Sequence, residues 1–343
     1  MKNIFRHSVF FAVLLSMVAS SCADRADKSV SRSFRNEVVL KTTPVKDQGS
    51  SELCWAYAML ATIETERLEM GDSVNLSPDY LARLWLQDQA RACFLTRGRV
   101  GVSLRGMVPM ALRLIERYGM EPYDSYHPLG SISYRSLSRA AMQVARASRS
   151  LRMLDTRLGS MLDRQIGYLP PTLFMLGVGY TPQDFAQSVY VEGDYVALTS
   201  FTHHPFGKAF VMEAADNRML DTFRNVPLDS LMKTIVSCLR HGHPVCWEGD
   251  VSESGFNFRR GCATLPDERH TPTQAERQRA FEQFLTTDDH CMELCGLARD
   301  ANGRLYFIAK NSWGTGNAYR GFMYLSYNYV RMKTIAIVVR NGE

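Results

Sequence analysis

Four residues of the types that catalyse acyl transfer occur along the chain in the order Gln48, Cys54, His290 and Asn311. A cysteine thiolate is a strong nucleophile, and a histidine can serve as its general base and acid. An asparagine can orient that histidine, and a glutamine amide can donate a hydrogen bond to an oxyanion. These residue types predict a cysteine hydrolase if the fold brings the four side chains together.

Cys54 lies where a loop gives way to an expected helix. The segment 42–51 is rich in turn-forming residues, the residues that follow Cys54 are small or apolar, and Gly71 is placed to end the helix. A helix N-terminus stabilises negative charge and lowers the pKa of a thiol. Gln48, on the loop, can aim its amide at an oxyanion together with the backbone N–H of Cys54.

His290 and Asn311 lie on two expected strands that a turn at 300–303, with the sequence Asp-Ala-Asn-Gly, should join as a hairpin. If the loop holds an even number of residues, facing residues have numbers with an odd sum, as His290 and Asn311 do. We therefore expect both side chains on one face of the hairpin, unless a β-bulge intervenes.

The pattern around these residues changes from helix to strand along the chain. Helices are expected near 54–70 and 108–118 and through 138–165. Short runs rich in β-branched and aromatic residues predict strands in the second half. These runs are 195–199, 244–251, 291–298, 305–310, 322–326 and 334–339. The expected fold class is α+β.

The first residues have the pattern of an export signal. Lys2 and Arg6 precede an apolar run at 9–18, which ends in small residues before Cys22. The sequence Val-Ala-Ser-Ser-Cys resembles a bacterial lipoprotein cleavage box, so we expect residues 1–21 to be removed and Cys22 to carry the lipid. An ordinary signal peptide is the alternative. Polar residues 22–36 then form a tether, and the folded domain begins at Glu37.

The chain has 343 residues, 45% hydrophobic and 22% charged, which suits one large or two closely packed globular domains. The net charge of +5 is spread along the chain without a basic block, so nucleic acid is not an expected partner. The cysteines show no disulfide framework and no metal-ligand spacing. His203 and His204, like His241 and His243, lack a third ligand nearby in the sequence, and we expect no metal and no cofactor.

Four segments together resemble the papain-like cysteine peptidases. They are Pro44–Ser50, Cys54–Tyr57, Asp289–His290 and Asn311–Gly314. The absence of a cysteine at Ser51, the Asp-Asp-His run at 288–290, the strand at 244–250 and the long gap between the nucleophile and the histidine resemble the bleomycin hydrolase or aminopeptidase C branch. The likeness covers most of residues 40 to 340.

The resemblance implies a two-lobe fold and a peptidase mechanism. A mainly helical lobe, about 37–190, would carry the nucleophile, and an antiparallel β-barrel lobe, about 190–343, would carry the histidine. The peptide substrate would lie between the lobes. Trp313 would shield the bond between His290 and Asn311 from water. The branch implies an aminopeptidase, held at the bacterial cell envelope by the predicted lipid on Cys22 and facing the periplasm or the cell surface.

Some residues near the expected cleft depart from the family pattern. Glu52 stands where relatives have glycine; it would raise the pKa of the nucleophile, anchor a cationic substrate group, or remain a solvated loop charge. Arg105 and Gly106 align with a Gly-Gly pair of the cleft wall, although Gly101 is a competing placement. Cys291 follows the histidine and places a second thiol beside the site, either inert or able to form an inhibitory disulfide.

These departures leave two alternatives open. In the branch the C-terminus of the chain blocks the cleft, but residues 338–343 follow the last expected strand so closely that this tail is expected to be too short. An endopeptidase or a dipeptide-releasing peptidase is therefore one alternative. The other is a catalytically impaired papain-fold lipoprotein that binds peptides. The sequence does not specify an oligomeric state.

Overall fold

The computed structural model describes residues 33–175 and 177–342. The predicted signal peptide at 1–21 and the lipidation site at Cys22 lie outside the described residues. Among the residues that are described, no helix combines the length and the hydrophobicity needed to cross a membrane.

The first half of the described chain is helical, as predicted. Its helices are α1 (Cys54–Glu69), α2 (Pro78–Leu95), α3 (Pro109–Tyr118), α4 (Tyr134–Ala147), α5 (Leu151–Gln165) and α6 (Pro182–Val189). Gly71 and Gly119 follow the ends of α1 and α3 with φ values of 86° and 85°, a conformation that favours glycine. The sequence reasoning missed α2, although Ser77 caps it and Pro78 occupies its first position.

The second half forms one large mixed sheet. Its strands run in the order β5 (Ala209–Val211), β6 (Thr222–Asn225), β4 (Tyr195–Thr199), β13 (Thr334–Arg340), β7 (Val245–Gly249), β10 (His290–Arg299), β11 (Leu305–Lys310), β12 (Phe322–Ser326), β9 (Cys262–Ala263) and β8 (Phe256–Asn257). β1 (Arg35–Val39) pairs with β10 off this path, and β2 (Leu173–Met175) pairs with β3 (Val178–Tyr180) in a separate hairpin.

The sheet confirms the α+β class and corrects the expected antiparallel barrel. The pairs of β4 with β6 and of β12 with β9 are parallel. Among the described strands the order is an open path from β5 to β8. β1 begins at Arg35, so the ordered sheet starts inside the segment 22–36 that was expected to be a tether.

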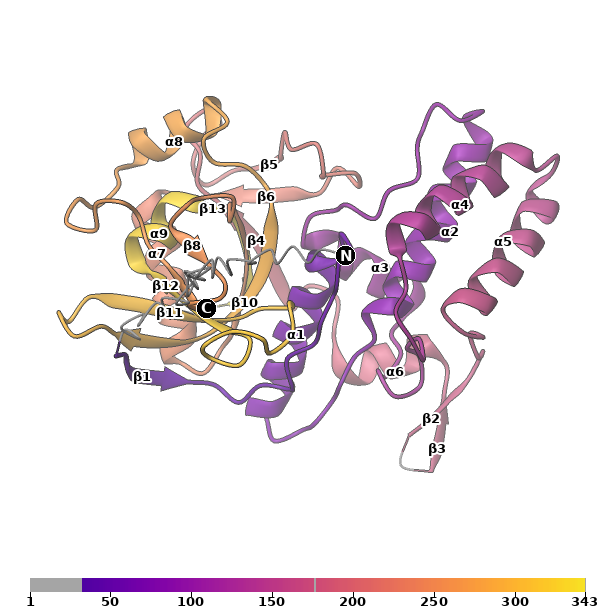
Figure 1. Ribbon diagram of the computed structural model, residues 1–343, viewed down its shortest axis with the longest axis horizontal. Helices are drawn as coiled ribbons and strands as arrows, with labels where there is room; N and C mark the ends of the chain where they lie inside the picture. The colour runs from indigo at the N-terminus through magenta and orange to yellow at the C-terminus, as the bar shows by residue number, and fades with distance from the viewer. Residues whose placement is uncertain (1–32, 176, 343) are drawn as a thin grey trace, which may run out of the picture. The chain divides into compact units, whose positions relative to one another are not determined.

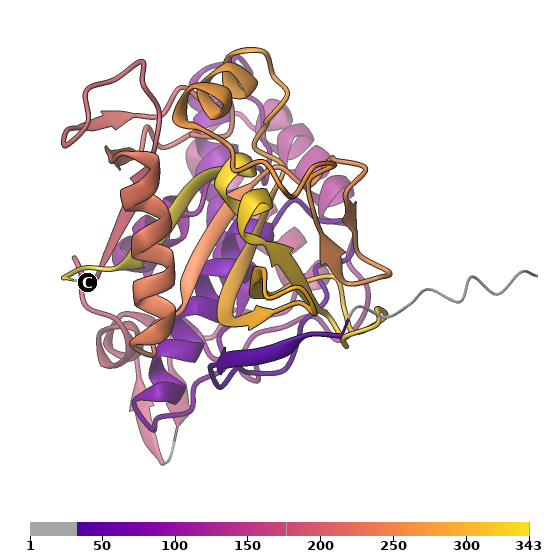
Figure 2. The ribbon, with the colours of Figure 1, turned by 90° about the vertical axis from the view of Figure 1, so that its left-hand side faces the viewer.

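The central strands are buried on both faces because helices cover both sides. On β7, the side chain of Cys246 packs in the core that contains α1, whereas its neighbours Val245 and Trp247 pack in the core that contains α7 (Leu228–Arg240). Figures 1 and 2 show these two helices on either side of the strands. Alternate side chains of a strand point to opposite faces, so Glu248 shares the α1 face with Cys246.

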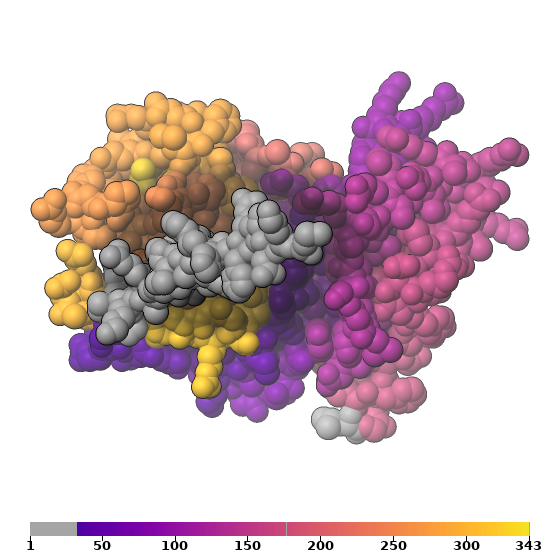
Figure 3. Space-filling model, in the orientation of Figure 1, coloured from indigo at the N-terminus to yellow at the C-terminus, as the bar shows by residue number. Residues whose placement is uncertain are grey.

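The two halves of the chain have separate hydrophobic cores. One contains α1 to α6, and the other contains α7 and the central strands. In the space-filling view the helical residues, indigo to magenta, and the residues of the sheet, orange to yellow, gather on different sides (Figure 3). Two short helices, α8 (Gln274–Glu282) and α9 (Tyr327–Lys333), complete the β lobe.

The hairpin of β10 and β11 forms as predicted, but its register does not follow the assumption made from the sequence. The loop 300–304 holds an odd number of residues, and next to it Leu297 faces Phe307, so the numbers of facing residues have an even sum. With this register alone, the candidate histidine and asparagine would lie on opposite faces.

A β-bulge between Leu294 and Gly296 changes the register further along the hairpin. Beyond the bulge Glu293 faces Lys310, and the sum becomes odd. The odd loop and the bulge therefore cancel each other, and the candidate histidine and asparagine project from the same face.

Candidate active site

Cys54 is the first residue of α1 and is partly exposed. The residue before it, Leu53, gives no side-chain cap, and the first turn contains no acidic residue. The N-terminal backbone N–H groups of this 16-residue helix are therefore available to stabilise a negative charge at the sulfur. Packing of α1 between the other helices and the sheet fixes this position.

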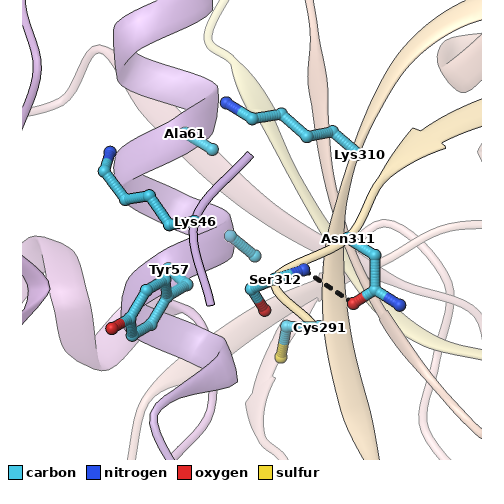
Figure 4. A pocket seen from close by; sticks show the side chains of 8 residues that line it. Lys46, Tyr57, Ala61, Cys291, Lys310, Asn311 and Ser312 are labelled. Carbon is cyan, nitrogen blue, oxygen red and sulfur yellow. Dashed lines mark hydrogen bonds between the residues drawn. The ribbon is translucent and has the colours of Figure 1, made fainter. Parts of the chain in front are cut away.

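His290 begins β10 and is only 3% exposed. Its Nε2 lies 2.8 Å from Oδ1 of Asn311. The Ser312 backbone N–H donates to the same oxygen at 2.7 Å. Figure 4 shows this bond between Ser312 and Asn311. Because a backbone N–H donates to it, this atom is the oxygen of the amide, so the histidine Nε2 must be the donor. The ring Nδ1 is thereby left for the nucleophile.

Trp313 covers this histidine. The two ring centroids are 4.5 Å apart, and the rings are inclined by 33°. Phe256 and Phe258 hold the indole edge-to-face at 5.8 and 5.3 Å. This aromatic cover keeps water from the hydrogen bond between the histidine and Asn311, which strengthens the bond because the local dielectric is low.

The Cys54 thiol contacts both His290 and the neighbouring Cys291. Hydrogen bonds from Cys291 and from His290, together with the charge of the imidazole, lower the pKa of Cys54 well below its usual value, although burial opposes the shift. The Cys291 thiol remains protonated because burial raises its pKa well above the usual value. The site thus favours a thiolate at Cys54.

Gln48 is held by three hydrogen bonds near the nucleophile. Its Nε2 donates to Ser51 O at 2.8 Å, its Oε1 accepts from Ser312 Oγ at 2.6 Å, and its backbone N–H donates to Ser312 O at 2.8 Å. An amide NH2 group carries two hydrogens, so the second N–H is left to point into the cleft beside Cys54. With the backbone N–H of Cys54, it makes up the pair of donors that the sequence predicts for an oxyanion.

An open cleft of about 1000 Å³ exposes the nucleophile. Gly106 lines this cleft, and Gly101 is not among the residues that line it. A Cβ on Gly106 would lie 1.9 Å from Met110 Cε, so any larger residue here would require the Met110 side chain of α3 to move. The residues that line the cleft are Gln48, Gly49, Ser50, Ser51, Glu52, Cys54, Arg105, Gly106, Asp216, Asp288, Asp289, His290, Cys291 and Trp313.

Comparisons with known proteins agree with this geometry. Residues 174–343 match the model of the Peptidase C1-like family. The chain is 23% identical to aminopeptidase G of Lactobacillus delbrueckii subsp. lactis over 94% of this chain and 86% of the relative. The match to the family model and the likeness to this relative over nearly the whole chain support a papain-like peptidase.

Two further papain-like proteins are similar to it. Mitochondrial cysteine proteinase 1 of Saccharomyces cerevisiae is 23% identical, with 93% of this chain and 79% of the yeast protein aligned. The crystal structure of PepW from Lactobacillus rhamnosis superposes with a TM-score of 0.72 at 17% identity and covers 91% of this chain and 83% of that one. The structural likeness confirms the papain-like fold.

The structure places the departures from the papain-like pattern around the cleft. Glu52 is exposed on its rim. Arg105 is bonded to Asp216, with its Nε 3.0 and 2.8 Å from the two carboxylate oxygens. The sequence reasoning did not single out Asp216, because it lies on the loop after β5 and reaches the cleft only through the tertiary fold.

Behind Cys291 lies a buried carboxyl group that the sequence reasoning also missed as a functional candidate. Cys291 faces Glu248 across the pair of β10 and β7, and its Sγ lies 3.6 Å from Glu248 Oε1. Glu248 is fully buried, and burial raises its pKa well above the usual value. A charged residue inside an apolar strand was the signal that could have found it.

One expectation about metal ligands is corrected. Glu213 supplies the third polar side chain that His203 and His204 lack in the sequence, with its carboxylate 3.3 and 2.6 Å from their Nε2 atoms. Gln278, whose Oε1 accepts from Thr202 N, donates to His203 Nδ1 at 3.1 Å. The neutral His203 ring therefore carries its proton on Nε2 and donates to Glu213, so hydrogen bonding already accounts for this contact.

Cys54, Cys93, Cys246, Cys291 and Cys295 are free thiols. Cys93 is buried in the helical core. Cys54 and Cys291 therefore lie in contact as two thiols. The surroundings lower the pKa of Cys54 and raise the pKa of Cys291, so only Cys54 is favoured as a thiolate.

Proposed function

We propose that this chain is a cysteine aminopeptidase that uses Cys54, His290, Asn311 and Gln48 to remove residues from the amino terminus of peptides. The observation that carries the proposal is the Cys54 thiol at a helix N-terminus, in contact with a histidine that Asn311 orients at 2.8 Å. The names of aminopeptidase G and cysteine proteinase 1 support the same activity.

The mechanism follows from the donors and acceptors of the site. The Cys54 thiolate attacks the carbonyl carbon, and the backbone N–H of Cys54 and the free N–H of Gln48 stabilise the oxyanion. His290 protonates the leaving amine and then takes a proton from the water that hydrolyses the thioester. Asn311 keeps the ring in the required tautomer in both steps.

The preference for the amino terminus needs its own support within this chain. Residues 338–342 do not line the cleft, because Arg340 pairs with Glu66 at 2.5 Å and Asn341 bonds to Asp194 at the far end of β13. In this proposal the preference depends on the kinship with aminopeptidases and on the carboxyl groups of the cleft.

A peptide-digestion assay with the full-length protein in detergent tests the proposal. A synthetic decapeptide should lose single residues stepwise from its amino terminus, as followed by mass spectrometry, and the Cys54→Ala variant should release none. Internal cuts would instead indicate an endopeptidase, and released dipeptides would indicate a dipeptide-releasing peptidase. Intact peptide together with an ordinary labelling profile of the Cys54 thiol would favour the peptide-binding alternative.

We further propose that the protein is a lipoprotein of the bacterial cell envelope, anchored through Cys22. The support is the sequence alone: a basic start, an apolar run and small residues before the cysteine. In a bacterial host, the wild type should partition into the detergent phase of a Triton X-114 extract, and Cys22→Ser should move it to the aqueous phase. Equal partitioning of the two proteins would count against a lipid at this residue.

A further inference from the structure

The cleft around the nucleophile has an excess of carboxyl groups. Glu52, Asp216, Asp288 and Asp289 line it, and the only lysine or arginine among its lining residues is Arg105. The guanidinium of Arg105 is already neutralised, because it is bonded to Asp216 at 2.8 Å. No lysine or arginine of the described residues forms an ion pair with the other acidic side chains of the cleft, so the cleft favours a positively charged ligand.

Two of the carboxyl groups near the nucleophile form a pair. Glu248 on β7 hydrogen-bonds to Asp288, which lies two residues before His290. Asp288 Oδ2 is buried, and no donor N–H or hydroxyl group of the described residues reaches it. A buried carboxylate oxygen without a donor is costly, so this atom marks a place where a ligand can add a missing hydrogen bond.

Two other buried carboxylates each face a lysine. Glu64 faces Lys46 at 2.6 Å, and Glu293 faces Lys310 at 3.7 Å. The described residues supply no such partner to Asp288. Burial and the charge of the nearby thiolate raise its pKa to about 8, the behaviour of a carboxyl group that lacks a counter-ion.

The position of the pair suits one end of a substrate. Glu248 contacts Cys291 at 3.6 Å, and Cys291 in turn contacts the nucleophile. One thiol side chain thus separates the carboxyl pair from the reacting sulfur. In a bound substrate, the α-amino group lies two bonds from the carbonyl carbon that the sulfur attacks. The α-amino group is therefore also within about one side chain of the sulfur, on the scale that separates the sulfur from the carboxyl pair.

We propose that Asp288, supported by Glu248, binds the free α-ammonium group of the residue that is removed. This inference rests on the proposed peptidase function and assigns its amino-terminal preference to named residues of the cleft wall. The ammonium donates to Asp288 Oδ2 and supplies the cation that the pair lacks. The side chain of a lysine or arginine in the substrate carries the same kind of charge and is the competing source of the cation.

Three fluorogenic amides of 7-amino-4-methylcoumarin distinguish an α-ammonium group from a basic side chain as the bound cation, in assays of the full-length protein. They are the alanyl amide with a free amino group, its N-acetylated form, and the N-acetyl-lysyl-alanyl amide. For Asp288→Asn, which keeps the shape and removes the charge, we expect kcat/KM on the free-amine substrate to fall about 100-fold, the size of losing one buried charged hydrogen bond. The ratio of free-amine to acetylated turnover should collapse toward one.

A matched variant controls for the loss of a negative charge as such. Asp267 is an exposed acid of the same lobe, remote from the lining of the cleft, and Asp267→Asn should leave all three rates within about twofold. Equal losses for Asp288→Asn on the free and acetylated substrates would overturn the inference, because they would indicate damage to the catalytic machinery. A loss confined to the lysyl substrate would also overturn it and would assign the site to a basic side chain.

Binding without turnover separates this inference from the proposed function. In the Cys54→Ala background, a tripeptide with a free amino terminus should bind about 100-fold more tightly than its acetylated form by calorimetry. Adding Asp288→Asn should abolish the difference. If the wild type cleaves no peptide but this difference is present, the peptidase proposal fails and the ammonium site stands; equal binding of the two tripeptides overturns the ammonium site.

Discussion

Replacing Cys291 with alanine tests how the structure activates the nucleophile. The Cys291 thiol is the first cause of the lowered Cys54 pKa, ahead of the histidine, because it donates a hydrogen bond to the thiolate. A hydrogen bond to a charged group contributes about 1.5–3 kcal/mol, and a thiol is a weak donor, so the low end, about 1.5 kcal/mol, applies. Each 1.36 kcal/mol shifts a pKa by one unit, so Cys291→Ala should raise the Cys54 pKa by about one unit.

The assay is alkylation of the full-length protein with iodoacetamide between pH 4 and 9, with the Cys54 peptide quantified by mass spectrometry. Only the thiolate reacts, so below both pKa values the rate for Cys291→Ala should be about tenfold lower than for the wild type. Cys291→Ser keeps a donor at the same place and should restore the wild-type profile.

Cys295 offers a matched control on the same strand. It is buried like Cys291, but its thiol donates to Ile308 O at 3.6 Å. Cys295→Ala therefore creates a comparable small cavity without touching the thiolate. A Cys54 profile that does not move in Cys291→Ala, or that moves equally in Cys295→Ala, would refute the hydrogen bond from Cys291 as a cause of activation.

Three further predictions follow from single contacts. Gln48→Ala removes one oxyanion donor and should lower kcat about 100-fold in the peptidase assay without moving the Cys54 labelling profile. Gly106→Ala forces Met110 aside and should cost about 1–3 kcal/mol of stability, measured as the free energy of unfolding in urea. Glu121 is buried without a hydrogen-bond partner in the described residues, and burial raises its pKa to about 7. Its charging destabilises the fold as pH rises from 4.5 to 7, so Glu121→Gln should add roughly 2 kcal/mol at pH 7.5 and nothing at pH 4.5.

Each of these has a control or a contradicting result. A Cβ added at Gly101 would have no atom within 4 Å, so Gly101→Ala should keep the free energy of unfolding within about 0.5 kcal/mol of the wild-type value. A shifted labelling profile in Gln48→Ala would mean that the glutamine acts on the thiol and not on the oxyanion. An equal gain for Glu121→Gln at pH 4.5 and 7.5 would show that the charge of Glu121 is not the source of the destabilisation.

The hairpin illustrates how a correct prediction can hide two compensating errors. The same-face placement of His290 and Asn311 was inferred from an even loop without a bulge. The loop 300–304 is odd, and a bulge between Leu294 and Gly296 restores the parity. Whether a strand bulges depends on how its side chains fit the neighbouring layers, and that information is not local to the hairpin.

Local chemistry in the sequence was sufficient to predict the central strands of the sheet, helices α1, α3, α4 and α5, and the candidate catalytic set. The strands 195–199, 305–310 and 322–326 have the predicted bounds, and α1 begins at Cys54. These features depend on the periodicity of apolar residues and on nearby turn and cap residues, which act over a few positions of the chain.

The surroundings of the nucleophile were decided by the tertiary structure. The surroundings of Cys54 include Cys291 and, behind it, Glu248 and Asp288. These residues lie near Cys54 only because β7 and β10 pair in one register on the face that packs against α1. A shift of one residue in that register would turn Glu248 to the α7 side. The sequence therefore determines which residues can do the chemistry. Strand pairing and packing determine which charges and donors surround those residues, because the contacts of β7 and β10 with α1 join segments that are distant in the chain.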